Sequence, residues 1–444
     1  MSKLRVGYCR INITPFEPVP LAGYGNTSMR VSQNILSELY ATCIAFTDEA
    51  DNTVLMFHND LISGGKRISE PCRNAISKAT GIPISNIMIG ATHTHSGPDT
   101  ANLNFDSIHR YLRYLPSQLT FCAEAALADR KEATMFIGKT ETKGLNFVRH
   151  YVLEDGTFKG DNFGDLNDSP FAGHTTQADP EMRIVKFVRE GGKDVVLVNW
   201  QTHPHRTGGS KKYDVSADIV GAMRDVVEAK WDCKFIYFTG GGGNVNPHSR
   251  IPEENITADF LEQGKAMAEH AFQVQFQEAK TGPIHLLENL HEELINRPDP
   301  KKVEAAELVH KYWRETNDFL PSCALANQYG FNSPYAAGHV ISRSKYEEGA
   351  TRTVPMYAFS IGDVAFATAP YEMFDTNAKQ IRDGSPFPMT IVSSCTNDGC
   401  GYIPSAYGYQ HGCYETDCSN FKPGTGEKFA QIYIDMLKQI YEKN

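Results

Sequence analysis

Six short apolar runs in this sequence are each followed at once by polar residues. The runs cover residues 53–57, 87–92, 194–198, 234–238, 363–370 and 389–392. Short continuous apolar runs are typical of strands that are buried on both faces, as in sheets covered by helices. Ligands of open α/β sheets bind beyond the carboxyl ends of the strands. We therefore expect the polar residues to form one shared site at one edge of a sheet.

Helix-forming segments alternate with these runs, which predicts the α/β class. We expect helices at residues 67–80, 216–231, 257–280, 300–316 and 427–443. Turn signals at residues 48–52, 190–193 and 361–363 predict hairpins, and hairpins join antiparallel strands. The prediction is an α/β fold with a mixed β-sheet core flanked by helices, in a single catalytic domain over residues 1–444. The polar region 297–344 is the candidate for a cap or inserted subdomain.

Composition argues against two classes of protein, those that bind nucleic acids and those that span a membrane. The chain has 444 residues and a net charge of −10, which argues against a nucleic-acid partner because phosphate binding needs clustered Lys and Arg. No apolar run approaches the ~18 residues of a membrane span. The N-terminus lacks the apolar core of a signal peptide, so we expect a cytoplasmic location. The expected partner is a small-molecule substrate, and the oligomeric state stays open.

Two His-x-His segments indicate a metal site. His93 and His95 follow the run at 87–92, and His203 and His205 follow the run at 194–198. Side chains at positions i and i+2 of an extended backbone share a face, and imidazole is the commonest metal ligand. Glu372, after a third run, supplies the oxygen ligand of a His₂Glu zinc site. The alternatives are hydrogen-bonded loop histidines and a surface glutamate.

Supporting carboxylates are expected behind the histidines. Asp60 and Asp218 are the candidates to accept the second ring N–H of a ligand histidine. Alternatively, Asp60 caps a turn and Asp218 begins a helix.

The ten cysteines carry a weaker signal. Six are scattered and are expected to be free thiols packed as small apolar groups. The other four are spaced C-x4-C-x12-C-x4-C, unlike the C-x2-C pairs of structural zinc sites; they are Cys395, Cys400, Cys413 and Cys418. Packed thiols are the favoured interpretation of this cluster, a bound metal is the alternative, and its role stays open.

A glycine-rich loop at residues 239–247 follows the run at 234–238. It lacks the Gly-Lys-Ser/Thr ending of a P-loop, so it does not indicate nucleotide binding. Its backbone N–H groups are candidates to stabilise a developing oxyanion. A tight turn without a ligand is the alternative.

Taken together, these segments resemble the catalytic domain of the neutral/alkaline (non-lysosomal) ceramidase family of zinc amidases. The matching segments are Ile13-Thr14-Pro15, Leu21-Ala22-Gly23-Tyr24, His93-Thr94-His95-Ser96-Gly97-Pro98, Asn199-Trp200 with His203, Ala369-Pro370-Tyr371-Glu372, and residues 397–415. His203 matches after a one-residue shift, and His205 is the competing choice. Tyr402 and Tyr414 keep the twelve-residue spacing of the family's C-terminal segment.

The resemblance implies particular roles for these residues. It implies one zinc ion per chain, held by the side chains of His93, His203, Glu372 and Tyr402. It places His95 close to the metal-bound water, and Tyr414 as a phenol donor to the substrate oxyanion.

The glycine loop departs from the resembling family at one catalytic position. The family has a serine where this chain has Asn246. Asparagine cannot be acylated productively, but it can donate a hydrogen bond. We therefore expect a substrate other than ceramide, one that is smaller and more polar.

The predicted function is a zinc-dependent hydrolase that cleaves an amide, ester or lactone bond of a small polar substrate, such as a sugar derivative, with metal-activated water. Tyr414, Asn246 and the loop N–H groups would stabilise the oxyanion, and His95 or His205 would move the proton. Gly243, Asn244 and Arg149 are the expected substrate contacts. The alternatives are a metal-dependent isomerase or lyase acting on a polyol or sugar acid, and a non-catalytic zinc protein that binds a ligand.

Overall fold

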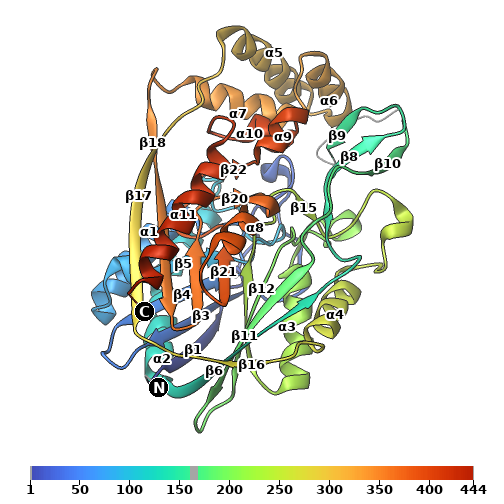
Figure 1. Ribbon diagram of the computed structural model, residues 1–444. Helices are drawn as coiled ribbons and strands as arrows, with labels where there is room; N and C mark the ends of the chain where they lie inside the picture. Colours follow the sequence, from blue (N-terminus) through green and yellow to red (C-terminus); the bar gives the residue numbers. More distant parts are fainter. Residues whose placement is uncertain (1–2, 161–168, 444) are drawn as a thin grey trace.

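Two stacked β-sheets form the middle of the molecule, and helices cover both outer faces (Figure 1). The computed structural model describes residues 3–160 and 169–443. Both sheets contain parallel and antiparallel pairs, so the predicted mixed α/β fold is confirmed. The six apolar runs fall in both sheets rather than in one, because four belong to the larger sheet and two to the smaller.

The larger sheet has nine strands in the order β14-β12-β11-β6-β1-β3-β4-β5, and β16 pairs with β6. Its strands are β1 (Arg5–Asn12), β3 (Tyr40–Thr47), β4 (Thr53–Asn59), β5 (Ile87–Ala91), β6 (Lys131–Glu141), β11 (Glu181–Arg189), β12 (Val195–Trp200), β14 (Lys234–Thr239) and β16 (Gln277–Ala279). The outer face of this sheet packs on two helix pairs. These are α1 (Lys66–Thr80) with α2 (Asp106–Ala128), and α3 (Asp218–Trp231) with α4 (Phe260–Ala271).

The smaller sheet has four strands in the order β17-β18-β19-β21. They are β17 (Ile284–Leu294), β18 (Thr351–Ile361), β19 (Val364–Thr368) and β21 (Met389–Ser393). Its outer face is covered by α8 (Asp375–Gly384) and α11 (Thr425–Tyr441), and α11 is the red helix in front of the sheet in Figure 1.

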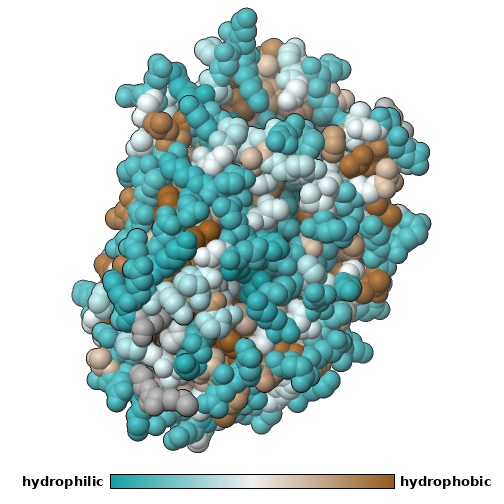
Figure 2. All heavy atoms as spheres, in the orientation of Figure 1, coloured by the Kyte–Doolittle hydropathy of each residue, from teal (hydrophilic) through white to brown (hydrophobic). Residues whose placement is uncertain are grey.

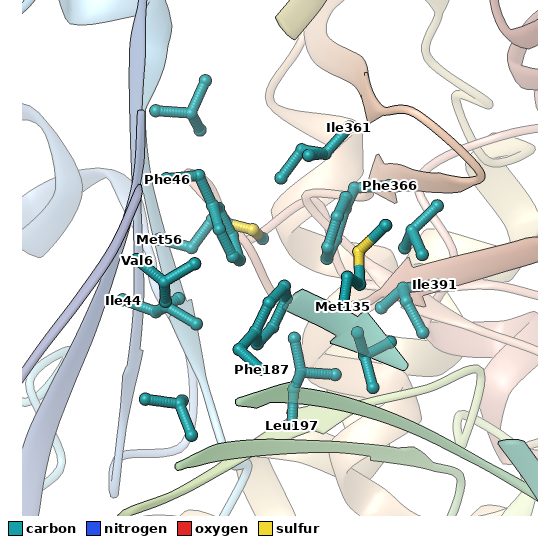
Figure 3. Packing of buried hydrophobic residues seen from close by; sticks show 14 of the residues in the cluster. Val6, Ile44, Phe46, Met56, Met135, Phe187, Leu197, Ile361, Phe366 and Ile391 are labelled. Atoms are coloured by element: carbon teal, nitrogen blue, oxygen red, sulfur yellow. The ribbon is translucent and has the colours of Figure 1, made fainter. Parts of the chain in front are cut away.

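Aromatic and aliphatic side chains from both sheets form the core between them. Figure 3 shows Phe46 and Phe187 of the larger sheet turned toward Phe366 of the smaller sheet. The ring centroids of Phe46 lie 5.4 Å from Phe187 and 5.6 Å from Phe366. Because alternate residues of each strand face opposite sides, every strand of this kind contributes to two apolar layers, which explains the nearly continuous apolar runs.

Short strands and helices connect the two sheets near the carboxyl ends of the strands that the six apolar runs form. The pairs are β20 (Glu372–Met373) with β22 (Tyr402–Ile403), β15 (Val245–Asn246) with β7 (Phe147–Val148), and β13 (Asp214–Val215) with β2 (Asn34–Ile35). A three-stranded sheet contains β8 (His150–Leu153), β9 (Phe158–Gly160) and β10 (Phe171–His174). Two short helices, α9 (Ala406–His411) and α10 (Tyr414–Cys418), lie nearby.

Most predicted elements are present. The three hairpins join β3 to β4, β11 to β12 and β18 to β19. The predicted helix at 257–280 is wrong in length, because α4 ends at Ala271 and residues 277–279 pair with β6. Phe272 and Phe276 continue the helical apolar spacing, but they pack against Trp231. Pairing with the part of β6 that β1 does not reach therefore overrides local helix periodicity here.

Three helices fill most of the region 297–344, where a cap or subdomain was predicted. They are α5 (Pro300–Thr316), α6 (Phe319–Gln328) and α7 (Pro334–Ser344), grouped at the top of Figure 1 beyond α10. They share a small apolar cluster that includes Val309, Phe331 and Val340. Among the described residues, no helix is long and apolar enough to cross a membrane. The face in Figure 2 is mostly hydrophilic, with hydrophobic residues in small separate groups.

Candidate metal centre

The strands that precede the polar segments end close together. The hydroxyl of Thr239, the last residue of β14, donates to the Ala91 carbonyl oxygen of β5 at 3.0 Å. The Ser394 N–H after β21 donates to the Thr239 carbonyl oxygen at 2.9 Å. These two hydrogen bonds hold the ends of β5, β14 and β21 together, and the polar segments converge at this point.

Three imidazoles and one carboxylate lie together there. Glu372 Oε2 is 3.3 Å from His93 Nε2 and 3.2 Å from His203 Nε2. His95 Nε2 is 3.5 Å from His93 Nε2. His93, His95 and His203 are buried, and each offers a ring nitrogen within 4.8 Å of the others. Imidazole nitrogens and a carboxylate oxygen directed at one point are the donor set of a transition-metal site.

The far ring nitrogens are held by backbone carbonyl groups. His93 Nδ1 lies 2.6 Å from the Ile62 carbonyl oxygen, and His203 Nδ1 lies 3.0 Å from that of Val245. An Nδ1–H that donates to a carbonyl leaves Nε2 as the lone-pair nitrogen, which is the tautomer a metal needs. His95 Nδ1 is buried without a hydrogen-bond partner among the described residues. The residues present therefore fit a bound metal ion.

The backbone at His93 supports the same interpretation. Its φ of 69° lies in the left-handed region, which non-glycine residues seldom adopt. Such conformations cost of order 1–3 kcal/mol and concentrate at functional sites.

Burial and neighbouring charges keep two of the ligand groups, the Glu372 carboxylate and the His203 ring, in their metal-binding forms. Burial alone would raise the pKa of Glu372, but the adjacent His93 and His203 rings hold it well below its usual value. Burial, together with the positive charge of Arg149, lowers the pKa of His203 to about 4. The carboxylate is therefore anionic and this imidazole is neutral at physiological pH.

The predicted supporting carboxylates are wrong. Asp60 binds Arg224 Nη1 at 2.9 Å and also accepts the Tyr40 N–H. Asp218 accepts the N–H and hydroxyl groups of Thr207. Both carboxylates hold the surrounding backbone, and the carbonyl groups of Ile62 and Val245 take the role expected of them. The sequence could not show this, because carbonyl oxygens carry no residue-specific signal.

Arg149 joins the parts of the site but has little capacity left for a substrate. Its guanidinium donates to Glu415 Oε1 at 2.6 Å, to the Gly243 carbonyl at 2.8 Å and to the Tyr402 hydroxyl at 3.3 Å. Its Nη1 atom is also 3.4 Å from Asn246 Oδ1. The side chain is buried. We correct its expected role from substrate contact to positioning of Tyr402 and the glycine loop.

Tyr402 and Tyr414 flank the carboxylate side of the site. The register of β20 and β22 pairs Glu372 directly with Tyr402. The Tyr402 and Tyr414 rings lie 5.8 Å apart at 72°. Burial raises the pKa of both phenols, and the negative charge of Glu372 raises both further. The expected neighbourhood of the two tyrosines is therefore present, while their roles stay a proposal.

Asn246 lies between His205 and Arg149. Its Oδ1 atom accepts a hydrogen bond from His205 Nε2 at 3.0 Å. The His205 ring is 5.4 Å from the His95 ring. The two histidines of the second His-x-His segment therefore have different neighbours. His203 faces Glu372, whereas His205 faces Asn246.

Much of the glycine loop is held by hydrogen bonds within the protein. The N–H groups of Gly240, Gly242 and Gly243 donate to the carbonyls of Trp200, Gly240 and Met373, and the oxyanion role of the loop stays a proposal. A Cβ atom on Gly243 would lie 2.8 Å from the Glu372 carbonyl oxygen, so glycine permits close approach to β20. Asn244 is also corrected, because its side chain exchanges hydrogen bonds with Asp375.

Several residues near the site were missed. Cys395 Sγ lies 3.6 Å from His93 Nδ1. The Tyr24 ring packs 5.3 Å from the His95 ring, and its hydroxyl donates to the His205 carbonyl oxygen at 2.6 Å. His339 lies on α7, where burial and Arg343 lower its pKa while the negative charge of Glu372 raises it. The four-residue spacing of Tyr335, His339 and Arg343 could have signalled one helix face.

The clustered cysteines are not gathered at one point. Cys395 lies at His93, whereas Cys413 groups with His150 and Glu415. All ten cysteines are free thiols. Glu415 already pairs with Arg149 and His150, so this second group is a buried polar network beside the metal centre.

Solved structures share this fold. The chain is similar to the crystal structure of neutral ceramidase from Pseudomonas aeruginosa, with a TM-score of 0.71 and 17% identity over 100% of this chain and 75% of that one. A ceramidase complexed with C2 gives a TM-score of 0.71 and 16% identity, covering 100% of this chain and 76% of that chain. No family model matches the sequence. The resemblance stated from sequence motifs is thereby confirmed as a shared neutral ceramidase-like fold.

Proposed function

We propose that this protein is a zinc-dependent hydrolase, with one zinc per chain, that cleaves an amide, ester or lactone bond of a small polar substrate. The observation that carries the proposal is the approach of His93 Nε2 and His203 Nε2 to the same oxygen of Glu372. The shared fold of hydrolases with low sequence identity supports the reaction class.

The ligands would be His93, His203, Glu372 and Tyr402, with His95 as the nearest further nitrogen. A zinc ion there would polarise a substrate carbonyl and lower the pKa of a water molecule to about 7. Tyr414 is placed beside Tyr402 to donate to the developing oxyanion. His95 and His205 flank the remaining side and are the groups that would move a proton toward the leaving group.

Ceramide, the substrate for which the neighbours are named, is not proposed as the main substrate here. Asn246 occupies the position at which the resembling family has a catalytic serine. Its Oδ1 atom is engaged by His205 Nε2. The Asn246 side chain thus orients His205, and the reaction needs no nucleophile from the chain.

The test is a hydrolysis screen of the zinc-loaded protein. N-acyl sugars, esters, lactones and a short-chain ceramide would be incubated and the products read by mass spectrometry. A gain of one water mass is expected for a polar substrate, and release of fatty acid from ceramide at the same efficiency would contradict the proposal. Glu372→Gln should abolish turnover, while Glu292→Gln, at an exposed carboxylate of β17, should not.

The remaining outcomes separate the other functions. Conversion without a change in mass would indicate an isomerase, and loss of water would indicate a lyase. Zinc binding with no conversion of any candidate would indicate a non-catalytic ligand-binding protein.

A further inference from the structure

A second cleft opens on the far side of Tyr24 from His95. It has a volume of about 340 Å³, which is in the size range of small-molecule sites. Its walls come from the loop around residues 24–30, from residues 212–213 and from the α5–α7 region. The residues are Tyr24, Gly25, Asn26, Met29, Arg30, Lys212, Tyr213, Trp313, Asn317, Phe319 and Tyr335.

The cleft is rich in aromatic rings. Trp313 and Tyr335 meet edge to face at 4.6 Å, and Phe319 lies 5.9 Å from Tyr335. The amides of Asn26 and Asn317 stand at the same walls. Flat apolar surfaces can contact the C–H face of a sugar ring, and nearby amides and hydroxyls can bind its hydroxyl groups.

The charge of the cleft is positive. Arg30 is only 5% exposed, and its guanidinium donates to the carbonyl oxygens of Ala22, His95 and Lys212 and to the Ser96 hydroxyl. Over residues 3–160 and 169–443, neither Arg30 nor Lys212 has a salt bridge to a carboxylate. Burial lowers the pKa of Arg30 to about 10, so it is still cationic at neutral pH. The Arg30 guanidinium lies over the Tyr24 ring and the Lys212 ammonium over the Tyr213 ring, so rings and carbonyl groups hold both cations without neutralising their charge. An anionic group of a ligand would neutralise them.

The loop at residues 23–25, between the cleft and the metal centre, has glycines at its two closest contacts. A Cβ atom on Gly23 would lie 2.3 Å from His95 Cγ, and one on Gly25 would lie 2.6 Å from the Tyr335 hydroxyl. Gly23 has a φ of 96° and Gly25 a φ of 57°. Glycines therefore let this loop pass between His95 and Tyr335. A ligand in the cleft lies one aromatic ring, that of Tyr24, away from His95 and His205.

We propose that this cleft binds an anionic sugar, either a uronic acid or a sugar phosphate, as the part of the substrate remote from the bond that is cleaved. This binding site is inferred from the aromatic rings and amides of the cleft and from its two cations, neither of which has a carboxylate partner among the described residues. Its link to catalysis rests on the proposed hydrolase function.

Tryptophan fluorescence gives a binding test that needs no turnover. The chain has three tryptophans. Trp200 is fully buried in the sheet, Trp231 packs on Phe272 and Phe276, and Trp313 lines the cleft. Titration of the zinc-loaded protein with glucuronate or glucose 6-phosphate should give a saturable change that Trp313→Phe abolishes. Tighter binding of glucuronate would identify a carboxylate as the recognised anion, and tighter binding of glucose 6-phosphate would identify a phosphate.

Neighbouring lysines provide a matched pair of variants. Lys212→Gln should weaken binding of the anionic sugar about twofold to fivefold, the effect of one charged contact at an exposed rim. Lys211→Gln should leave binding unchanged, because Lys211 lies over the Phe260 ring, which does not line the cleft, whereas Lys212 lies over the cleft residue Tyr213. Lys212 is exposed, so its replacement should not disturb folding.

The outcomes separate this inference from the proposed function. Glucose binding as tightly as glucuronate and glucose 6-phosphate would overturn the anionic assignment, and tighter binding of hexanoate or choline would overturn the sugar assignment. A Trp313 signal that no sugar changes would overturn the site, even if the protein hydrolyses a polar amide. Saturable sugar binding without hydrolysis of any candidate would support the site while contradicting the proposed hydrolase.

Discussion

The two sides of the candidate site are built in different ways. The metal-facing side consists of side chains at the ends of buried strands, and hydrogen bonds from the Thr239 hydroxyl and the Ser394 N–H hold the ends of β5, β14 and β21 together. The opposite side is formed by helices α5 to α7, which have their own small apolar cluster. Rigid strand ends suit chemistry that needs fixed distances, whereas a separately packed helical group can change without moving the ligands. We expect variants on the two sides to fail in different ways.

Metal ligands should show the largest effect. His93→Ala or Glu372→Ala removes one of the groups that converge at the centre, so zinc content should fall to background and activity with it. Elemental analysis after dialysis measures this loss. Ser342→Ala, on the exposed side of α7, is the control and should keep full zinc content. Full zinc in both ligand variants would mean that the metal centre has been misplaced.

The buried Arg149–Glu415 pair comes next. Glu415→Gln leaves the guanidinium without its carboxylate, which typically costs about 3–5 kcal/mol of folding stability for a buried pair. Urea denaturation measures the loss, and zinc affinity should also fall because Arg149 contacts Tyr402. The matched control is Glu17→Gln, which breaks a solvent-exposed pair with Arg110. Equal losses in the two variants would contradict a special role for the buried pair.

Sequence reasoning was more successful for the strands than for what lies around them. His93, His95, His203 and Glu372 follow apolar runs, so their place at one end of the sheets could be predicted. The extended backbone assumed for the His-x-His spacing is absent at His93, whose φ is 69°. Asp60 was misassigned because its partner, Arg224, comes from a distant segment. Local periodicity cannot reveal which of several polar groups a long-range contact will use.

The helical side shows the same limit. The hydrophobic period predicted a helix over residues 300–316, and the Asp299 cap and the proline at the first turn explain why α5 begins there. Ser333 caps α7 in the same way, with Pro334 at the first turn, and this signal was overlooked. The face that α7 turns toward the site depends on packing against α10, through the Arg343 hydrogen bond to the Asp417 carbonyl oxygen. No spacing within α7 specifies that partner.

Tyr402 and Tyr414 lie on the metal-facing side, and we expect their phenylalanine variants to fail in different ways. Tyr402→Phe should lower zinc affinity, and added zinc should restore part of the activity. Tyr414→Phe should keep normal zinc content and lower kcat about 10²–10³-fold with little change in KM, as for loss of one oxyanion donor. Zinc titrations and steady-state kinetics distinguish the two. If both rings only pack, both variants should lose stability while activity per folded molecule stays normal.

The smallest effect is expected on the helical side, at His339. Tyr335, His339 and Arg343 lie on one face of α7. At one end of this face Tyr335 lies close to Gly25, in the loop beside His95, and at the other end Arg343 donates to the Asp417 carbonyl oxygen of α10. His339→Gln keeps a polar side chain but removes the ring, so one substrate hydrogen bond should be lost or weakened. We expect KM to rise about twofold to tenfold, the equivalent of a net hydrogen bond of 0.5–1.5 kcal/mol, with kcat unchanged. Zinc content should stay normal, because α7 contributes none of the proposed ligands. A fall in zinc content, or in kcat at normal KM, would show that α7 takes part in the metal centre and that the two sides are not independent.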